Sequence, residues 1–356
     1  MPLRRPIGAV SLCCFLLAVG PGCGAGAEVG PAGARTVSAA VTRKDSRFFS
    51  PRSVWNRAVP AQAPLDPRSF ELVSHFAAEV AEERRRGEGP SINTSRWSVP
   101  LYRVPADQPR VRVRLRSRPE RLPVPALRRA WGSVPLPRFP RPARGRDRPL
   151  VVWQPSSDSL WEFWGMRRAL HGGWKAAWGG AIRRVTRSSG VYGPRAWPGA
   201  DSSWGASASA LSIVGGLITF EDLERGRIDH ALAMSIPRVR AGEYSLPARR
   251  TDGTSTDPLS LPEGAHLRLD PALDLASLGL PRPTLMLAEA AQKYGIVLRD
   301  RAGIVVFYGQ DPVPTGEDPY NGPGGYYEGL TAGEIMARFP WDRLQLLRMD
   351  LRCECG

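Results

Sequence analysis

Short apolar runs separated by turn-forming residues recur along the chain and predict a mostly-β fold. Many short strands joined by turns are typical of a β-sandwich or jelly-roll-like body, so we expect one such domain over residues 48–311. Residues 110–116 alternate strictly between arginine and an apolar residue, which places four arginines on one face of a strand. The other runs that predict strands are 150–154, 160–164, 211–220, 231–236, 266–269, 296–298 and 304–308.

Helical spacing of apolar residues is rarer and predicts two or three helices at the periphery. The clearest helices are expected over residues 69–84 and 283–294, with a shorter one over 220–225. Residues 300–303 then predict a hairpin turn between two apolar strands. Residues 312–356 are expected to form a Gly- and Pro-rich C-terminal extension with one short helix.

The N-terminus has the composition of an export signal. Residues 1–27 combine two early arginines, a short apolar run and the small residues Ala25-Gly26-Ala27, and they predict a secretory signal peptide. The alternative is a lipoprotein that is cut before Cys23 and carries a lipid anchor on it. Residues 28–47 are rich in Gly, Ala, Ser and Thr and predict a flexible spacer. We therefore expect an extracellular or cell-envelope protein with no membrane span.

The formal net charge of +15 raises the question of nucleic-acid binding. Of the 49 basic residues 46 are arginines, and enrichment in Arg, Ala, Gly and Pro is typical of a GC-rich genome. No helix-turn-helix, zinc-finger or RNA-binding motif accompanies the charge, so we expect no nucleic-acid partner. Cys353 and Cys355 are too few and too close for a disulfide framework or a zinc site, and we expect no metal and no cofactor.

The most informative feature is a cluster of tryptophans, because seven of the eleven in the chain lie between Trp153 and Trp204. Indole faces stack on the apolar faces of sugar rings, and the neighbouring Gly, Ser, Lys, Arg and Asp residues are typical of a groove wall. The alternative is that the tryptophans fill the space between sheets, since Trp is buried on average. The residues expected to bind substrate are Trp164, Trp174, Trp178 and Trp204.

Candidate catalytic groups lie in and near the tryptophan segment. Glycan hydrolysis needs two carboxyl groups across the scissile bond, and Glu162 and Asp201 are the candidates. A lyase acting on a uronic acid instead needs a base and a cation that neutralises the substrate carboxylate. His230 is the candidate base, with Tyr244 and Arg249 binding the substrate beside it. The alternative for His230 is structural, with its ring satisfying backbone groups at the start of a strand.

Several motifs in a fixed order carry a resemblance to a known family. They are Val54-Trp55-Asn56 with Pro60, paired glycines before Trp174, residues 226–232 with Pro237, Pro247-Ala248-Arg249, residues 264–269, and Lys293-Tyr294-Gly295 with Asp300. Over most of residues 48–311 the chain resembles a widespread group of secreted bacterial proteins, common in actinobacteria and often joined to carbohydrate-binding modules. The Arg- and Pro-rich segment 110–148 departs from the pattern. The resemblance implies an extracellular, glycan-associated setting and no particular reaction.

Together these features predict a secreted carbohydrate-active protein that acts on a polysaccharide or cell-wall glycan as a glycoside hydrolase or lyase. The alternatives are a non-catalytic glycan-binding envelope protein and a structural envelope protein without a small ligand. The arginines of residues 110–116 are expected either to form a solvated strand edge or to bind acidic polysaccharides.

Overall fold

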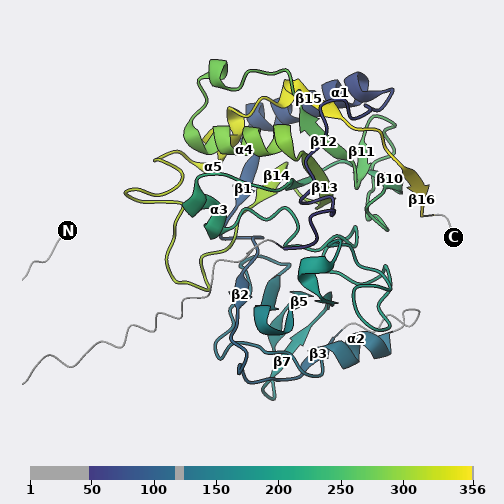
Figure 1. The fold of residues 1–356 in the computed structure, drawn as a ribbon, viewed down its shortest axis with the longest axis vertical. Helices are drawn as coiled ribbons and strands as arrows, with labels where there is room; N and C mark the ends of the chain where they lie inside the picture. The colour runs from purple at the N-terminus through teal and green to yellow at the C-terminus, as the bar shows by residue number, and fades with distance from the viewer. Residues whose placement is uncertain (1–47, 117–123, 355–356) are drawn as a thin grey trace, which may run out of the picture. The chain divides into compact units, whose positions relative to one another are not determined.

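A six-stranded mixed sheet, in the upper half of Figure 1, joins strands that are far apart in the sequence. The strand order is β1-β14-β9-β13-β12-β15, in which β1–β14 and β9–β13 are parallel pairs and the other pairs are antiparallel. β9 and β14 are buried at every residue, as expected for strands covered on both faces. The strands are β1 (Ser91–Asn93), β9 (Leu232–Ile236), β12 (His266–Leu269), β13 (Ile296–Arg301), β14 (Val306–Tyr308) and β15 (Leu344–Leu346).

The computed structural model describes residues 48–116 and 124–354, which belong to one unit over Asp45–Gly356. The predicted signal peptide, the predicted spacer and Cys23 lie outside the described residues. Within the described ranges, no helix has the length and apolar character that a membrane crossing requires.

Helices cover the six-stranded sheet. α1 buries Leu72, Phe76 and Val80 and ends at Gly87, whose positive φ of 69° permits the left-handed turn. α4 packs on β12 and α5 on β1. The α-helices are α1 (Ser69–Arg86), α2 (Val124–Ala130), α3 (Phe220–Arg225), α4 (Arg282–Lys293) and α5 (Ala332–Ala337). Short 3-10 turns are η1 (Pro155–Ser157), η2 (Val185–Arg187), η3 (Ala276–Leu278) and η4 (Trp341–Arg343).

Three smaller sheets complete the fold. Their strand orders are β2-β4-β5-β8, β3-β7-β6 and β11-β10-β16. The strands are β2 (Leu101–Arg103), β3 (Val113–Leu115), β4 (Leu150–Gln154), β5 (Ser159–Trp164), β6 (Arg167–Arg168), β7 (Trp174–Ala176), β8 (Trp178–Arg183), β10 (Val239–Ser245), β11 (Leu261–Glu263) and β16 (Leu351–Cys353).

Two clusters of buried apolar side chains hold these elements together. One packs around β4, β5 and β8, where the Trp131 and Phe163 ring centroids lie 4.8 Å apart. The other fills the space between the six-stranded sheet and its helices, with Phe307 and Trp341 ring centroids 5.8 Å apart. Each burial of a large aromatic side chain contributes on the order of 2–3 kcal/mol to folding.

The mostly-β prediction is confirmed, because the described residues form sixteen strands and only five short α-helices. The sandwich or jelly-roll arrangement stays a prediction. The described part of the predicted domain 48–311 contains four α-helices where two or three were expected, and the additional one is α2, which buries Ala126, Leu127 and Ala130 within a Pro- and Arg-rich segment. The predicted extension 312–356 contains α5 as expected, and it also supplies β15 and β16 to two sheets.

Two predictions about local structure were wrong. Residues 211–220 do not form a strand, because Gly215 packs so closely on the Trp55 ring that a Cβ would lie 2.3 Å from it, and Gly216 adopts a φ of 69°. Residues 300–303 do not turn a hairpin. β9 lies between β13 and β14 and pairs with both, so the two strands flank a third instead of each other.

Candidate functional site

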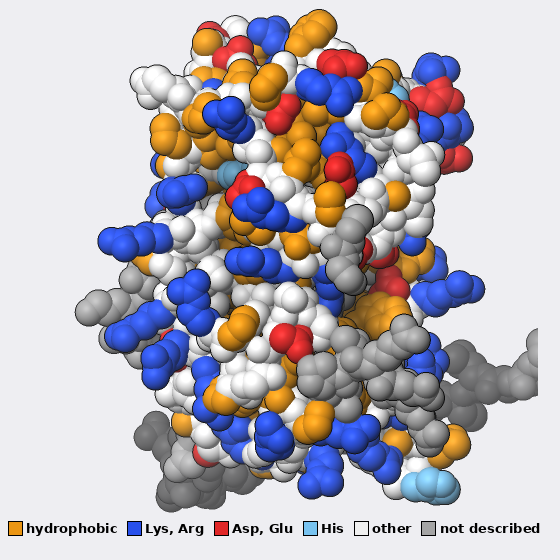
Figure 2. Space-filling model, turned by 90° about the vertical axis from the view of Figure 1, so that its right-hand side faces the viewer, with side chains coloured by type: hydrophobic (Ala, Val, Ile, Leu, Met, Phe, Trp, Pro, Cys, Tyr) orange, Lys and Arg blue, Asp and Glu red, His pale blue; other side chains and the backbone are white. Residues whose placement is uncertain are grey.

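Positive charge is concentrated in one part of the chain. Residues 94–210 contain 22 of the 49 Lys and Arg residues but only 6 of the 34 Asp and Glu residues. The difference of 16 exceeds the net charge of +15 for the whole chain, so the remainder is close to neutral. A genome that favours arginine codons does not explain the local lack of acidic residues. Figure 2 shows Lys and Arg side chains gathered over the lower part of the molecule, where β2, β3, β5, β7 and α2 lie in Figure 1.

Almost none of these cations has an acidic partner. Among the described residues of this segment, only Arg103 forms an ion pair, with Glu221 at 2.9 Å. Several arginines lie instead over aromatic rings, where the guanidinium is stabilised and keeps its charge. These pairs include Arg110 over Trp161, Arg168 over Trp174 and Arg183 over Trp197. The positive charge of the described part of residues 94–210 is therefore not neutralised by acidic side chains.

Three cations stand opposite one another across the sheet β3-β7-β6. Arg114 on β3 pairs with Lys175 on β7, and Lys175 pairs with Arg167 on β6. Residues paired directly across strands point to the same face, with neighbouring strands about 5 Å apart. Arg112 and Arg116 flank Arg114 at two-residue spacing just outside β3, where a continued extended backbone would place them on its face. We call these five residues the cationic face.

The two faces of this small sheet differ in burial. On the face opposite Arg114, Val113 and Ala176 are at most 2% exposed and Leu115 and Trp174 are half-buried, whereas Arg168 is exposed over Trp174. On the cationic face the four arginines are exposed and Lys175 is half-buried. Like charges directly opposite each other destabilise a sheet, so an anionic ligand on this face would remove an internal repulsion.

One arginine predicted to share this face is held elsewhere. The Arg110 guanidinium donates to Gln154 Oε1 at 2.5 Å and to the Ser133 carbonyl oxygen at 3.0 Å. β3 covers only Val113–Leu115, and Val111 makes an isolated bridge to Val134. The regular strand predicted over residues 110–116 is therefore shortened, and Arg110 does not belong to the cationic face.

The seven tryptophans divide into core and surface groups. Trp153, Trp161 and Trp204 are at most 4% exposed and belong to the core around β4 and β5. Trp204 was expected to bind substrate, but its indole is fully buried and inaccessible to one. Trp174 is half-buried beneath Arg168.

Trp164 and Trp178 form the accessible aromatic pair. Trp164 on β5 pairs directly with Trp178 on β8, so the two side chains lie next to each other on one face. Trp164 is 42% exposed, and its indole N–H donates to Asp147 Oδ1 at 3.1 Å. The Trp178 indole N–H donates to the Ser203 carbonyl oxygen at 2.7 Å. Both ring systems are fixed in position by these bonds.

Glu162 is a buried residue whose contacts are structural. Its side chain is 0% exposed, and its carboxylate accepts hydrogen bonds from Ala206 N at 3.1 Å, Ile213 N at 3.0 Å and Ser212 Oγ at 2.9 Å. Burial raises the pKa of Glu162, and the two backbone N–H groups oppose that shift. The carboxylate thus holds the loop that covers it and is shielded from any substrate in the solvent.

His230, whose side chain is 15% exposed, pairs with a buried acid that sequence reasoning did not select. Its Nε2 lies 3.1 Å from Asp222 Oδ2, and its Nδ1 lies 2.9 Å from the Ala231 carbonyl oxygen. Asp222 also closes the capping box of α3 with Thr219. With both ring nitrogens facing acceptors, the ring has no free lone pair to act as a base. The geometry matches the structural interpretation of His230.

The remaining predicted site residues, Asp201, Arg249 and Tyr244, occupy different places in the fold. Asp201 accepts from the backbone N–H of Ser203 at 2.8 Å, within a turn. The Arg250 guanidinium donates to the Ser203 carbonyl oxygen that also accepts from the Trp178 indole. Arg249 is exposed, and Tyr244 is half-buried on β10 opposite Glu263. Among the described residues, no hydrogen bond or ion pair joins any two of Glu162, Asp201 and His230.

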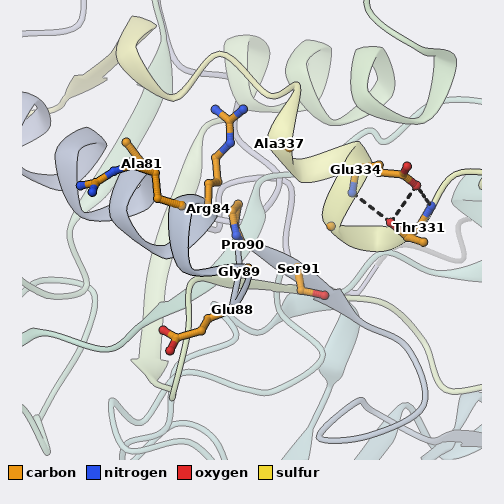
Figure 3. A pocket seen from close by; sticks show the side chains of 12 residues that line it. Ala81, Arg84, Glu88, Gly89, Pro90, Ser91, Thr331, Glu334 and Ala337 are labelled. Atoms are coloured by element: carbon orange, nitrogen blue, oxygen red, sulfur yellow. Dashed lines mark hydrogen bonds between the residues drawn. The ribbon is translucent and has the colours of Figure 1, made fainter.

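Two hollows on the described surface lie away from the tryptophans. One, of about 720 Å³, lies between the end of α1, β1 and α5 (Figure 3). There Glu334 is occupied in capping α5 with Thr331, as the dashed lines in Figure 3 mark. The other, of about 750 Å³, lies between α3 and residues 315–329. Neither contains a predicted site residue.

Comparison with known proteins gives no identification. No protein-family model, curated protein or solved structure matches the chain. The resemblance to secreted bacterial proteins stays a prediction, and the candidate function rests on the geometry described above.

Proposed function

We propose that this protein binds an anionic glycan through its cationic face. The observation that carries the proposal is the row Arg114, Lys175 and Arg167, which faces solvent with no carboxylate in ion-pair distance among the described residues. Along an extended backbone Arg112, Arg114 and Arg116 are spaced about 7 Å apart, and across the strands the cations repeat at about 5 Å. A polymer with regularly spaced carboxylates or sulfates supplies negative charge at several of these points at once.

The aromatic pair supports a glycan over other polyanions. Trp164 and Trp178 lie three residues before Arg167 and three residues after Lys175 on the same hairpin. At about 3.3 Å per residue, roughly 10 Å of strand separates the indoles from the cations. Side chains three residues apart lie on opposite faces of a regular strand, and Gly165, with a φ of 68°, interrupts the backbone between β5 and β6. Indole rings stack on sugar rings, so the aromatic pair offers a saccharide a contact of its own. Export, predicted from the N-terminal residues, would give the protein access to cell-wall glycans.

The geometry favours a binding role over hydrolysis or elimination. The carboxylates and the base selected as catalytic candidates are each occupied in separate internal contacts. A glycosidase instead needs two accessible carboxyl groups on opposite sides of one bond. The non-catalytic alternative expected from the sequence is thus the better supported one.

Binding to polygalacturonate, alginate and heparin, with neutral dextran as a control polymer, tests the proposal. The variant Arg114→Ser/Lys175→Ser should bind the acidic polymers at least tenfold more weakly at low salt, with Tm nearly unchanged. The matched control Arg343→Ser/Arg348→Ser removes two exposed arginines outside residues 94–210 and should bind like the parent. Equal affinity of the first variant and the parent would refute the proposal, and so would tighter binding of a DNA duplex than of any acidic glycan.

A further inference from the structure

Three carboxylates from separate segments meet near the end of β11. Asp252 lies in the loop after β10, Glu263 ends β11, and Asp300 lies in β13. One oxygen of each lies within 4.8 Å of an oxygen of the other two. Asp252 is exposed, Asp300 is half-buried and Glu263 is 0% exposed, so the group runs from the surface into the interior.

The buried member of this group is incompletely satisfied. Glu263 Oε2 accepts from the backbone N–H of Asp252 at 3.2 Å, whereas Glu263 Oε1 is buried without a hydrogen-bond partner. A buried carboxylate oxygen without a donor is strongly unfavourable unless a cation or a proton compensates it. This orphaned oxygen is a second observation, separate from the clustering of the three acids.

The neighbouring arginines do not supply the missing contact. Arg301 Nη2 lies 3.6 Å from Asp252 Oδ2, at the exposed end of the group. The Arg250 guanidinium is directed to backbone carbonyl oxygens of residues 202–208. Neither arginine therefore contacts the buried Glu263 Oε1.

We propose that Asp252, Glu263 and Asp300 bind Ca²⁺. The donor atoms are all carboxylate oxygens, without His or Cys, which favours a hard cation over zinc or copper. Two ligands on opposite sides of a calcium ion lie about 4.6–5.2 Å apart, since each Ca–O bond is about 2.3–2.6 Å. The exposed Asp252 leaves an entry path, and water fills the coordination positions that the protein leaves open. The ion links the loop after β10 to β11 and β13.

Thermal unfolding with and without Ca²⁺, in the absence of any polysaccharide, tests this site. Saturating CaCl₂ should raise the Tm of the EDTA-treated protein by roughly 5 °C, and calorimetric titration should show one site. Glu263→Gln should raise the Tm of the metal-free protein, because it removes a repelling charge at constant volume, and should abolish the response to Ca²⁺.

Asp300→Asn provides a second variant with the same expected loss of response. The matched control Glu243→Gln removes an acid on neighbouring β10 that pairs with Arg240, and it should respond to Ca²⁺ like the parent. An unchanged Tm of the parent in millimolar CaCl₂, or a full response in both Glu263→Gln and Asp300→Asn, would overturn the proposal. Because no glycan is present, failure here is distinguishable from failure of the proposed glycan binding.

Discussion

His230 Nε2 lies 3.1 Å from Asp222 Oδ2, and the pair joins the start of β9 to the capping box of α3. Burial lowers the pKa of His230, but the charge of Asp222 and its hydrogen bond outweigh burial and raise that pKa overall. Burial raises the pKa of Asp222, but His230 and Thr219 outweigh burial and lower it overall. The two shifts agree on an imidazolium–carboxylate pair.

The His230–Asp222 pair should make the folded state less stable as the pH rises. A histidine whose pKa is higher in the folded state contributes stability that is complete below its unfolded pKa of about 6.5 and is lost as the pH rises through its folded pKa. Asp222 loses its contribution only as the pH falls below about 4. The free energy of unfolding should therefore decline as the pH rises above about 6.5, and His230→Gln should flatten that decline. Denaturant titrations at several pH values measure how the unfolding free energy changes with pH in the parent and in His230→Gln. An equal change in both proteins would contradict the assignment of this pH dependence to His230.

His266 should produce the opposite dependence. Its Nε2–H donates to the Tyr294 carbonyl oxygen at 3.0 Å, and burial lowers its pKa to about 4. A neutral buried histidine leaves stability intact above pH 6.5 and reduces it as the pH falls, by about 3 kcal/mol at pH 4. His266→Gln should lower the unfolding free energy at pH 7 and narrow its difference between pH 7 and pH 4.5. A difference as large as that of the parent would assign the acid sensitivity to other groups.

Glu162 should matter for stability and not for ligand binding. Glu162→Ala leaves three buried donors without their acceptor, which costs roughly 3 kcal/mol or more. Glu162→Gln keeps the volume and one acceptor oxygen, so its loss should be smaller. Urea unfolding ranks the two variants against the parent. A fully stable Glu162→Ala protein with impaired glycan binding would instead return Glu162 to the role predicted from the sequence.

Substitution of Trp164 should weaken ligand binding, whereas substitution of Trp204 should lower folding stability. Trp204→Ala opens a cavity in the core and should cost on the order of 3–5 kcal/mol. Trp164→Ala removes a side chain that is 42% exposed, so it should change Tm little and weaken binding of acidic oligosaccharides by roughly fivefold. Tryptophan fluorescence titration and thermal unfolding separate the two effects. A Trp164→Ala protein that binds as tightly as the parent would limit the binding site to the cations.

Local patterns predicted the elements whose partners lie nearby or whose periodicity is strong. The helix with buried Phe76 and the paired strands β4 and β5 follow from helical spacing and from short apolar runs. The hairpin after Asp300 was mispredicted because the sequence does not reveal that β9 enters between its two strands. The absence of a strand at Gly215 depends on its contact with Trp55, which is 160 positions away.

The candidate site was predicted only in part for the same reason. Arg112 and Arg114 were selected from strict alternation, but Lys175 and Arg167 join them through a register between strands that no local pattern encodes. Trp204 was mispredicted because neighbouring polar residues do not reveal burial. The concentration of charge in residues 94–210 is visible in the sequence when acids and bases are counted by segment.

The salt dependence of binding to an acidic polysaccharide tests the central claim most directly. Each cation that displaces a counterion contributes about 0.7 to the slope of log K against log salt for a single-stranded polyanion. The parent protein should show a slope of about −2 to −4 between 50 and 300 mM NaCl, for three to five contacts. Arg114→Ser/Lys175→Ser should reduce the magnitude of that slope by about 1.4. A parent affinity that does not change with salt, or identical slopes for parent and variant, would contradict binding through the cationic face.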